Sequence, residues 1–374
     1  MYIKHILYIH FFYYIVFCYS ENYENLYKWM MRNGAYISNK IIPIEETIYN
    51  RYIIAKEKIY QKEELVFIPD NLTISTLNNL VYNKCTDDFK EFLSYAEKEE
   101  KYSFDYDCLV YFLTIDIENK NSIFRDYYNY LPEISKLDFP IYFTEDEKRD
   151  FNKIELETQI RRQDLFFNKS LKPIKNKILK IPNGLEKFKK SFIYVSTRNF
   201  GRRESFYDDV NTLVPFLDLL NHSNNFNTYF YFNEKRNGFV LYSTKDIEPN
   251  EEITSSYGKF NNIYLYSMYG FTMKNNIYSS SIHIKIEKES FTLFEKIRES
   301  EIIKIVKHFN PKKEEERNEI ILKIKNALED KLSDYQQFFK KYKDNINIIN
   351  ICEDLDKTAK LYIELCKKLL NYNI

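Results

Sequence analysis

The segment Leu213–Ser223 reads LVPFLDLLNHS, so an apolar run ends in an asparagine–histidine pair. A second segment, Ile253–Gly258, reads ITSSYG and ends in a tyrosine–glycine step. Asn262 follows, and then the aromatic step Tyr269-Gly270-Phe271. Any one of these dipeptides occurs by chance in many proteins. Their ordered occurrence within about sixty residues is specific, and it indicates two strand ends followed by a short helix.

Strand and helix patterns alternate around these segments. We expect a sheet domain that is split by a helical insert and followed by a mostly helical tail, which is an α+β fold. The Asn237-Gly238 step predicts a tight turn between two strands. The lysine-rich segment 169–190 is predicted to be a solvated loop. Strands are predicted over 52–55, 64–69, 212–217, 228–232, 239–243 and 252–256, and helices over 25–33, 88–99, 105–117, 188–200, 262–268 and much of 285–374.

The composition limits the classes of function. The 374 residues carry 55 basic and 55 acidic side chains, so the formal net charge is zero. A balanced charge argues against a nucleic-acid partner, which needs a clustered basic surface. The 34 tyrosines and 30 phenylalanines are so frequent that an aromatic stripe is weak evidence for a ligand site.

The cysteines and histidines do not suggest a metal site or a disulfide framework. The five cysteines are odd in number and widely spaced, with no Cys-x-x-Cys pair. None of the five histidines has a second ligand at helical spacing, so no metal is expected. The chain also lacks an evident Cys-His or Ser-His-Asp set for nucleophilic catalysis.

Residues 1–20 are ambiguous. Lys4 and His5 precede an apolar run from Ile6 to Phe17, which is typical of a signal peptide or anchor. A retained run would give membrane contact through residues 1–20 alone, and a functional signal would direct the chain to the secretory pathway or the endoplasmic reticulum. A dispensable extension would leave the protein in the cytoplasm or nucleus.

The ordered motifs resemble the carboxyl half of a SET domain, and most of the chain resembles the branch that includes the Rubisco large-subunit lysine methyltransferase and the actin-histidine methyltransferase. The segments 29–35, 55 and 65–69 resemble the amino-terminal half of that family. The segments 124–132, 140–147 and 196–200 resemble its helical insert. The resemblance implies a SET core over 21–75 and 205–280, an insert over 76–204, and a substrate-binding-like helical domain over 281–374.

The resemblance also implies an activity and roles for named residues. The chain would transfer a methyl group from S-adenosylmethionine to a lysine of a protein substrate. Tyr257 would be the catalytic tyrosine and would contact the acceptor, together with Tyr269 and Phe200. The residues that would bind the donor are Arg198, Asp218, Asn221, His222, Tyr269 and Phe271.

One position departs from the family pattern. The family places Gly-x-Gly before the strand that ends at Ala55, whereas this chain has Asn50 and Tyr52 there. Asn tolerates a positive φ and Tyr adopts it at a cost, so either the loop is remodelled or donor binding is weakened. The second outcome would make the chain a catalytically silent SET-like interaction module.

The methylated side chain is a further open choice. In the histidine-directed enzyme, the second position after the insert's arginine is a polar asparagine that orients the imidazole. The matching residue here is Phe200, which offers no hydrogen bond. An apolar ring suits a lysine stem, so lysine is favoured and histidine is the alternative.

Overall fold

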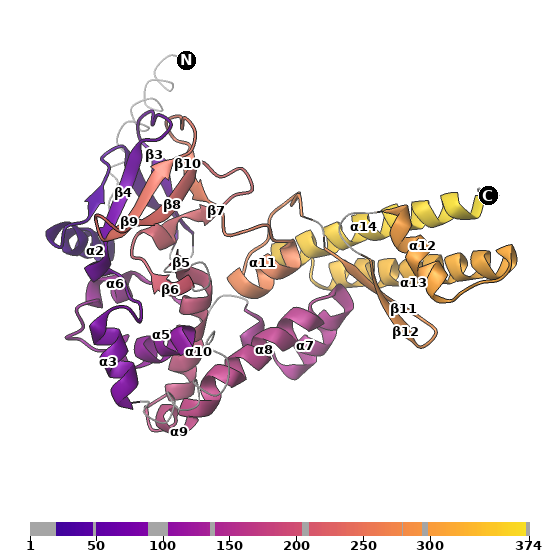
Figure 1. Ribbon diagram of the computed structural model, residues 1–374, viewed down its shortest axis with the longest axis horizontal. Helices are drawn as coiled ribbons and strands as arrows, with labels where there is room; N and C mark the ends of the chain where they lie inside the picture. Colours follow the sequence, from indigo (N-terminus) through magenta and orange to yellow (C-terminus); the bar gives the residue numbers. More distant parts are fainter. Residues whose placement is uncertain are drawn as a thin grey trace, which may run out of the picture. The chain divides into compact units, whose positions relative to one another are not determined.

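The computed structural model describes residues 20–47, 50–88, 104–134, 139–203, 209–278, 280–293 and 298–371. The expected signal or anchor segment therefore lies outside the described residues, apart from Ser20. The chain divides into two compact units. The first comprises Met1–Asp88, Phe104–Glu133 and Arg198–Ser255. The second comprises Phe89–Ser103, Ile134–Thr197 and Ser256–Ile374, and Figure 1 labels the elements of both.

The first unit is built on two four-stranded sheets. Their strand orders are β1-β4-β9-β8 and β2-β3-β10-β7, so each sheet joins strands from both halves of the sequence. The turn between β8 and β9 contains Asn237 at φ +51°, as its Asn-Gly step predicts. The bounds are β1 Tyr36–Ile37, β2 Ile41–Glu45, β3 Arg51–Ala55, β4 Glu64–Pro69, β7 Asn221–His222, β8 Thr228–Asn233, β9 Gly238–Ser243 and β10 Glu252–Ser255. A separate hairpin pairs β5 Asn199–Arg203 with β6 Asp209–Leu213.

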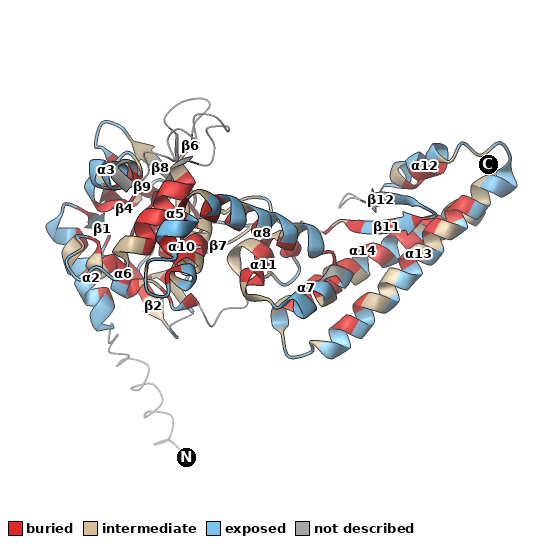
Figure 2. Cartoon of the chain, turned by 90° about the horizontal axis from the view of Figure 1, so that it is seen from below, coloured by how far each residue is buried: buried red, intermediate tan, exposed pale blue. Residues whose placement is uncertain are grey.

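The helices of the first unit contact one another in the pairs α2 with α6 and α3 with α5. They are α2 Glu21–Arg32, α3 Asn79–Asp88, α5 Phe104–Asp116 and α6 Arg125–Tyr130. Residues Tyr106 to Thr114 of α5 are all buried, and Figure 2 shows this helix red along most of its length. A helix that is buried on every side needs apolar residues on every side, which explains why α5 shows no amphipathic pattern.

The second unit is mostly helical. Its short elements are η3 Pro140–Tyr142, α7 Glu145–Phe151, η4 Asn152–Ile154, η5 Lys172–Ile174 and α9 Lys175–Ile178. Its longer helices are α8 Glu157–Leu171, α10 Gly184–Arg198, α11 Asn262–Tyr269, α12 Glu299–His308, α13 Glu314–Lys341 and α14 Ile346–Asn371. One apolar core joins α13, α14 and a hairpin of β11 Ile282–Ile286 with β12 Glu289–Leu293. The expected α+β class with a mostly helical carboxyl-terminal part is confirmed.

The lysine-rich segment 169–190 is helical, so the prediction of a loop was wrong. It contains the end of α8, then η5 and α9, and the first turns of α10. Leu171, Ile174, Ile178 and Phe188 are buried. These apolar residues recur at helical spacing under the lysines, whose long stems can cover apolar surface while the charge stays in water.

Other predicted bounds also need correction. Residues 282–293 form a hairpin, so the helix predicted from 285 onward was wrong over 285–293, and Glu287 takes a left-handed φ of +58° at the turn. The helix expected over 188–200 ends at Arg198, and Asn199 begins a strand. The strand expected over 212–217 ends at Leu213. Most of the helix expected over 88–99 lies outside the described residues.

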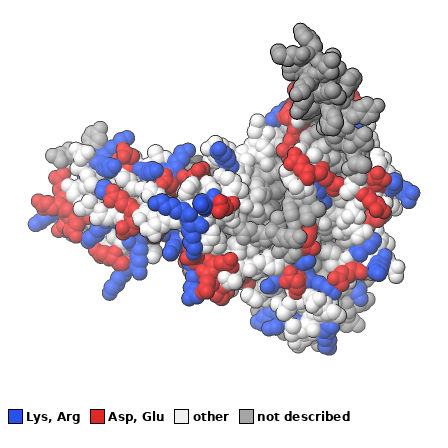
Figure 3. Space-filling view, turned by 180° about the vertical axis from the view of Figure 1, so that it is seen from behind, with Lys and Arg blue, Asp and Glu red and all other residues white. Residues whose placement is uncertain are grey.

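Charge and hydropathy add little to the placement of a site. Figure 3 shows basic and acidic side chains interspersed on the face that it displays. Among the residues that the structure describes, no helix is both long and apolar enough to cross a bilayer. The same residues include no cluster of three or more His, Cys, Asp or Glu that could hold a metal ion.

Candidate functional site

The segment that ends in Asn221-His222 contains an unusual backbone turn. Phe216 is fully buried and has φ +72° and ψ −42°, close to a γ-turn. A bulky residue with positive φ is a genuine outlier that the surrounding packing must stabilise. The turn reverses the chain after Pro215 and begins η6 Leu217–Leu219, which carries Asp218.

Asp218 lies in a buried polar cluster with Arg198 and Tyr127. Arg198 Nη1 is 3.2 Å from Asp218 Oδ2 and donates to the Asp218 carbonyl oxygen at 2.9 Å. Tyr127 donates its hydroxyl to Asp218 Oδ2 at 2.9 Å. The Asp218 side chain is 3% exposed and the Arg198 side chain 19%. Burial, with the charge of Asp218, raises the pKa of Tyr127 well above its usual value, so this phenol stays protonated and donates.

The Asn221-His222 pair forms β7, the edge strand of its sheet. It pairs in parallel with β10, with Asn221 opposite Thr254 and His222 opposite Ser255. Asn221 donates its side-chain amide to Glu252 Oε1 at 2.9 Å and to the Arg51 carbonyl oxygen at 3.4 Å. The amide therefore ties β7 to β10 and β3, while the outer edge of β7 points away from the sheet, as expected of an edge strand.

His222 is buried, with 9% of its surface exposed. Burial lowers the pKa of its imidazole, against smaller opposing effects of hydrogen bonds with Ser255 and Asn224. A lowered pKa keeps the ring neutral at physiological pH. A neutral ring adds no positive charge to this edge of the sheet.

Asn50 and Tyr52, which replace the expected glycines, form side-chain hydrogen bonds with Glu46 before and within β3. Asn50 Nδ2 donates to Glu46 Oε2 at 2.6 Å, and the Tyr52 hydroxyl donates to Glu46 Oε1 at 2.7 Å. The Asn50 amide also donates to Thr47 Oγ1 at 2.9 Å. Tyr52 has no positive φ, so its replacement of an expected glycine causes no left-handed strain.

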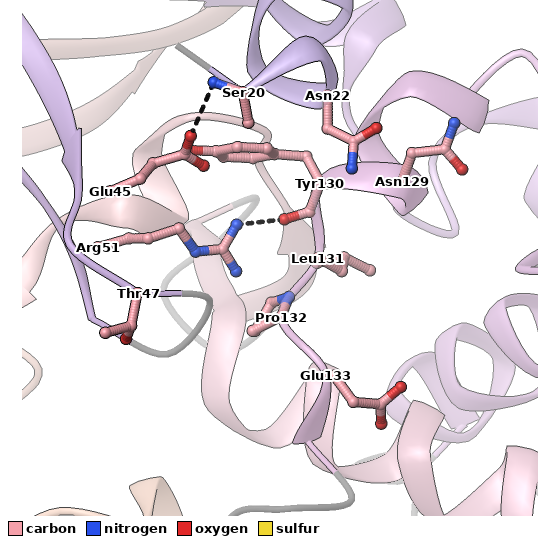
Figure 4. A pocket seen from close by; sticks show the side chains of 10 residues that line it. All are labelled: Ser20, Asn22, Glu45, Thr47, Arg51, Asn129, Tyr130, Leu131, Pro132 and Glu133. Carbon is pink, nitrogen blue, oxygen red and sulfur yellow. Dashed lines mark hydrogen bonds between the residues drawn. The ribbon is translucent and has the colours of Figure 1, made fainter. Parts of the chain in front are cut away.

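A pocket of about 500 Å³ borders the same strand, as Figure 4 shows. Arg51 projects into it, donates to the Tyr130 carbonyl oxygen and lies 4.6 Å from the centre of the Tyr130 ring. Glu45, the partner of Arg51 on the neighbouring strand β2, accepts a hydrogen bond from the Ser20 amide at 3.2 Å. The other lining residues are Asn22, Thr47, Asn129, Leu131, Pro132 and Glu133. The pocket thus combines one cation, two carboxylates and aromatic surface.

Phe200 lies on β5 in an aromatic environment. Its ring packs edge-on against Phe230 at 4.8 Å between centroids, and against Phe239 at 6.5 Å. The residue is partly exposed, so one part of the ring remains accessible beside this packed surface. The rings nearest to it are therefore apolar.

Three aromatic residues of the second unit form a cluster. The Tyr257 ring lies 4.9 Å from that of Tyr269 and 6.2 Å from that of Phe271, and the last two are 6.3 Å apart. Burial raises the pKa of the Tyr269 phenol above its usual value, so it stays protonated. Tyr257 follows the end of β10 by two residues.

Gly258 and the two ends of α11 restrict the backbone between Tyr257 and Phe271. Gly258 has φ +140°, and a Cβ at this position would come within 2.4 Å of the Phe260 ring. Only glycine can take this conformation without a clash. Asn261 caps α11 by accepting the amide of Tyr264 at 2.9 Å, and Gly270 ends the helix with φ +76°. The helix therefore begins and ends at fixed points between Tyr257 and Phe271.

The structure brings the predicted residues together in two groups. Arg198 and Asp218 form a contact in the first unit, where Asn221 and His222 also lie side by side on β7. Tyr257, Tyr269 and Phe271 form the ring cluster of the second unit. Sequence reasoning missed Tyr127, Glu252 and Arg51, although Tyr127 falls in the segment 124–132 already noted for its family resemblance.

The chain has measurable similarity to known proteins. The SET domain profile matches residues 37–258, which is more than half of the chain. An N-lysine methyltransferase setd6 of Xenopus laevis is 22% identical over 262 residues, which is 65% of this chain and 55% of that protein. SET domain-containing protein 4 of Artemia parthenogenetica is 28% identical over 182 residues, or 46% of this chain and 45% of that protein. The matches thus span about half the length of these curated relatives.

Solved structures agree with the fold at low sequence identity. The SET domain of LSMT bound to lysine and AdoHcy has a TM-score of 0.67 and 14% identity, covering 94% of this chain and 91% of that chain. Rubisco LSMT bound to AdoMet has a TM-score of 0.67 and 15% identity, covering 94% and 93%. At this level of identity the likeness concerns the fold.

Proposed function

Because the chain belongs to the SET-domain family, we propose that it is an S-adenosylmethionine-dependent protein-lysine N-methyltransferase. The observation that carries the proposal is the parallel pairing of β7 with β10, which places Asn221-His222 beside Thr254-Ser255. Tyr257, the proposed catalytic residue, follows Ser255 by two residues. The order of these elements is the one that the family motifs predict.

The residues of the first unit suit a zwitterionic donor. Arg198 presents a guanidinium that suits a carboxylate, and Asp218 keeps it in place. The edge strand β7 presents peptide groups that can bind a polar ligand, while the Asn221 side chain holds the strand to its neighbours. The pocket beside Arg51 has a volume suited to a small ligand and borders β2 and β3 through Glu45 and Arg51.

The donor supplies a methyl group carried on a positive sulfonium. The protein's own contribution is to orient the acceptor and remove its water. The rings of Tyr257, Tyr269 and Phe271 exclude water from a lysine stem, and desolvation lowers the pKa of a lysine amine. We propose that the Tyr257 hydroxyl is a fixed dipole at the acceptor nitrogen.

Lysine is favoured as the acceptor by Phe200 and by the names of two relatives. The Phe200 ring packs against Phe230 and offers no hydrogen bond to an imidazole. The frog relative is named an N-lysine methyltransferase, and one LSMT structure contains lysine. The rival assignment is a protein-histidine methyltransferase, in which a polar group would have to orient the ring.

Transfer of tritium from labelled S-adenosylmethionine into a proteome extract tests the proposal, with mass spectrometry of the product. Labelled methyl-lysine supports it, and N-methylhistidine would establish the rival. If no tritium is incorporated and calorimetry detects no donor binding, the chain is a catalytically silent interaction module. This last outcome is included because Asn50 and Tyr52 stand where the family has glycines.

A further inference from the structure

A row of polar residues interrupts the apolar face of α14. Asn347, Asn350 and Asp354 are spaced by three and four positions, so they lie on one side of the helix. Their neighbours Ile348, Ile351 and Leu355 are fully buried in the core of the second unit. Asn350 itself is 6% exposed. Buried polar groups are costly unless they have partners, so this row should serve a contact.

The contact is with the loop that follows α11. Asn347 Nδ2 donates to the Gly270 carbonyl oxygen at 3.3 Å, and its Oδ1 accepts from the Thr272 hydroxyl at 3.0 Å. Asn350 Nδ2 donates to Thr272 Oγ1 at 2.9 Å. These bonds tie α14 to the residues immediately before and after Phe271.

Asp354 reaches the same loop through Asn262. Asn262 is fully buried and donates to Asp354 Oδ2 at 2.5 Å and to the Met273 carbonyl oxygen at 2.9 Å. Its Oδ1 accepts from the Met273 amide at 2.8 Å and from Asn276 Nδ2 at 3.2 Å. Asp354 therefore orients an amide that is bonded to both the backbone N–H and the backbone carbonyl oxygen of Met273 in the loop. Figure 1 shows α11 beside α14.

We propose that Asn347, Asn350 and Asp354 of α14 are positioning residues that fix Phe271 within the ring cluster of Tyr257, Tyr269 and Phe271. The inference rests on the proposed function, in which this cluster receives the acceptor side chain. The loop is tethered at Gly270, Thr272 and Met273, so the Phe271 backbone has little freedom to move. A ring that is held in place before the acceptor arrives lowers the ordering cost of binding.

The charge of Asp354 gives this contact a measurable signature. Burial raises the pKa of Asp354 to about 6, against the opposing effects of the Asn262 hydrogen bond and of Lys357. Glu353 adds a further upward effect. A carboxylate accepts a stronger hydrogen bond than a carboxylic acid does, so the tether should tighten as the pH rises through this range.

The test places 4-fluorophenylalanine at position 271 of the full-length chain and records its ¹⁹F NMR signal. The signal needs no turnover, so it reports ring position whether or not the protein proves to be a methyltransferase. We expect Asn350→Leu to shift or split the signal, and Asp354→Asn to abolish a titration of the signal near pH 6. Asp356→Asn is the matched control, because Asp356 pairs with Lys360 on the same helix at 2.6 Å.

Activity provides the second readout. The assay uses labelled S-adenosylmethionine and a library of lysine-containing peptides. We expect Asn350→Leu to lower kcat/KM about tenfold, because a displaced Phe271 ring would misalign the acceptor. Donor affinity by calorimetry should change less than twofold. A ¹⁹F signal that is unaltered in both α14 variants, or that shifts equally in Asp356→Asn, would refute the positioning role. If the ¹⁹F signal shifts in the α14 variants but the protein binds no donor, the positioning role is supported and the proposed function is rejected. Asp354→Asn keeps an acceptor oxygen for Asn262 and covers the case in which Asn350→Leu fails to fold.

Discussion

Arg198 and Asp218, twenty positions apart in the chain, form a partly buried ion pair in which the guanidinium also donates to the Asp218 main-chain carbonyl. The second bond fixes the arginine against the backbone of η6, so its orientation does not depend on the carboxylate alone. The pair therefore has two roles that can be separated: it stabilises the first unit, and it is proposed to hold the donor.

Replacing one partner of this pair should destabilise the protein more than replacing both. Arg198→Met leaves Asp218 charged at 3% exposure, at a cost of about 3 kcal/mol in the free energy of unfolding. The double variant Arg198→Met/Asp218→Leu should recover most of that loss because no buried charge remains. Urea denaturation measures both.

Calorimetry with S-adenosylmethionine separates the two roles of the pair. Donor affinity should stay low in the double variant, even though folding is restored. Tyr127→Phe is the control: it removes one hydrogen bond to a charged group, costs about 2 kcal/mol, and keeps the Arg198 side chain. Normal donor affinity in the double variant would exclude Arg198 and Asp218 from the donor site.

The Tyr257 hydroxyl should matter for turnover and little for folding. Tyr257→Phe keeps the ring contacts with Tyr269 and Phe271, and should lower kcat at least about tenfold. Methyl transfer to a peptide library measures the rate, and thermal unfolding checks the fold. Tyr264→Phe is a matched control, because Tyr264 stacks on Phe260 outside the three-ring cluster. Equal rates for the wild type and Tyr257→Phe would remove the catalytic role.

Gly258 should resist substitution for two separable reasons. Gly258→Ala forces a Cβ into a left-handed conformation and against the Phe260 ring, and should cost about 2 kcal/mol in the free energy of unfolding. Adding Phe260→Ala removes the clash and leaves the backbone strain. If the double variant is as stable as Phe260→Ala alone, the φ of Gly258 carries no cost and the argument from backbone strain fails.

The stability of the second unit should depend on pH through Glu155 and His283. Glu155 is 4% exposed at its side chain and lies 2.7 Å from His283 Nδ1 and 2.6 Å from Lys331 Nζ. It also accepts the Tyr335 hydroxyl at 3.0 Å. The hydrogen bond that His283 donates to Glu155 raises the pKa of His283. Burial and Lys331 oppose this effect, and Glu157 adds to it. Protonated His283 therefore stabilises the fold below its unfolded pKa of about 6.5, and this contribution is lost as the pH rises further.

Glu155 shows the opposite dependence on pH. Burial raises its pKa, but the His283 hydrogen bond and Lys331 outweigh burial and lower it below the usual value. Its contribution is present above about pH 4.5 and is lost as the pH falls through the lowered pKa. The second unit should thus be most stable between about pH 5 and 6.5.

Thermal unfolding at several pH values checks this window. His283→Gln should remove the loss of stability above pH 6.5. The His283–Glu155 pair is partly exposed, so it should contribute about 1 kcal/mol to the free energy of unfolding. His308→Gln is the control, since the His308 ring packs on Phe291 and Phe309. A wild type whose stability is constant from pH 6 to 8.5 would contradict the assignment.

Local patterns in the sequence predicted several elements correctly. The strands near 64–69 and 252–256, the Asn237-Gly238 turn and the helix after Asn261 formed as expected. Each depends on alternation, turn chemistry or a cap within a few residues. The segment 169–190 was mistaken for a loop because its lysines concealed the apolar spacing of Leu171, Ile174 and Ile178. The hairpin 282–293 was missed although Ile282, Ile284 and Ile286 alternate with polar residues, because the helical periodicity of the later segments was extended over the whole region from 285.

The sequence by itself determined the family, the order of the motifs and the identity of the proposed donor and acceptor residues. Only the tertiary structure decided what holds them. Tyr127 reaches Asp218, Asn221 ties β7 to Glu252, and Asn350 tethers the loop of Phe271, in each case across dozens of positions in the chain. Short motifs record local spacing, whereas these partners meet only after packing has brought distant segments within hydrogen-bond distance.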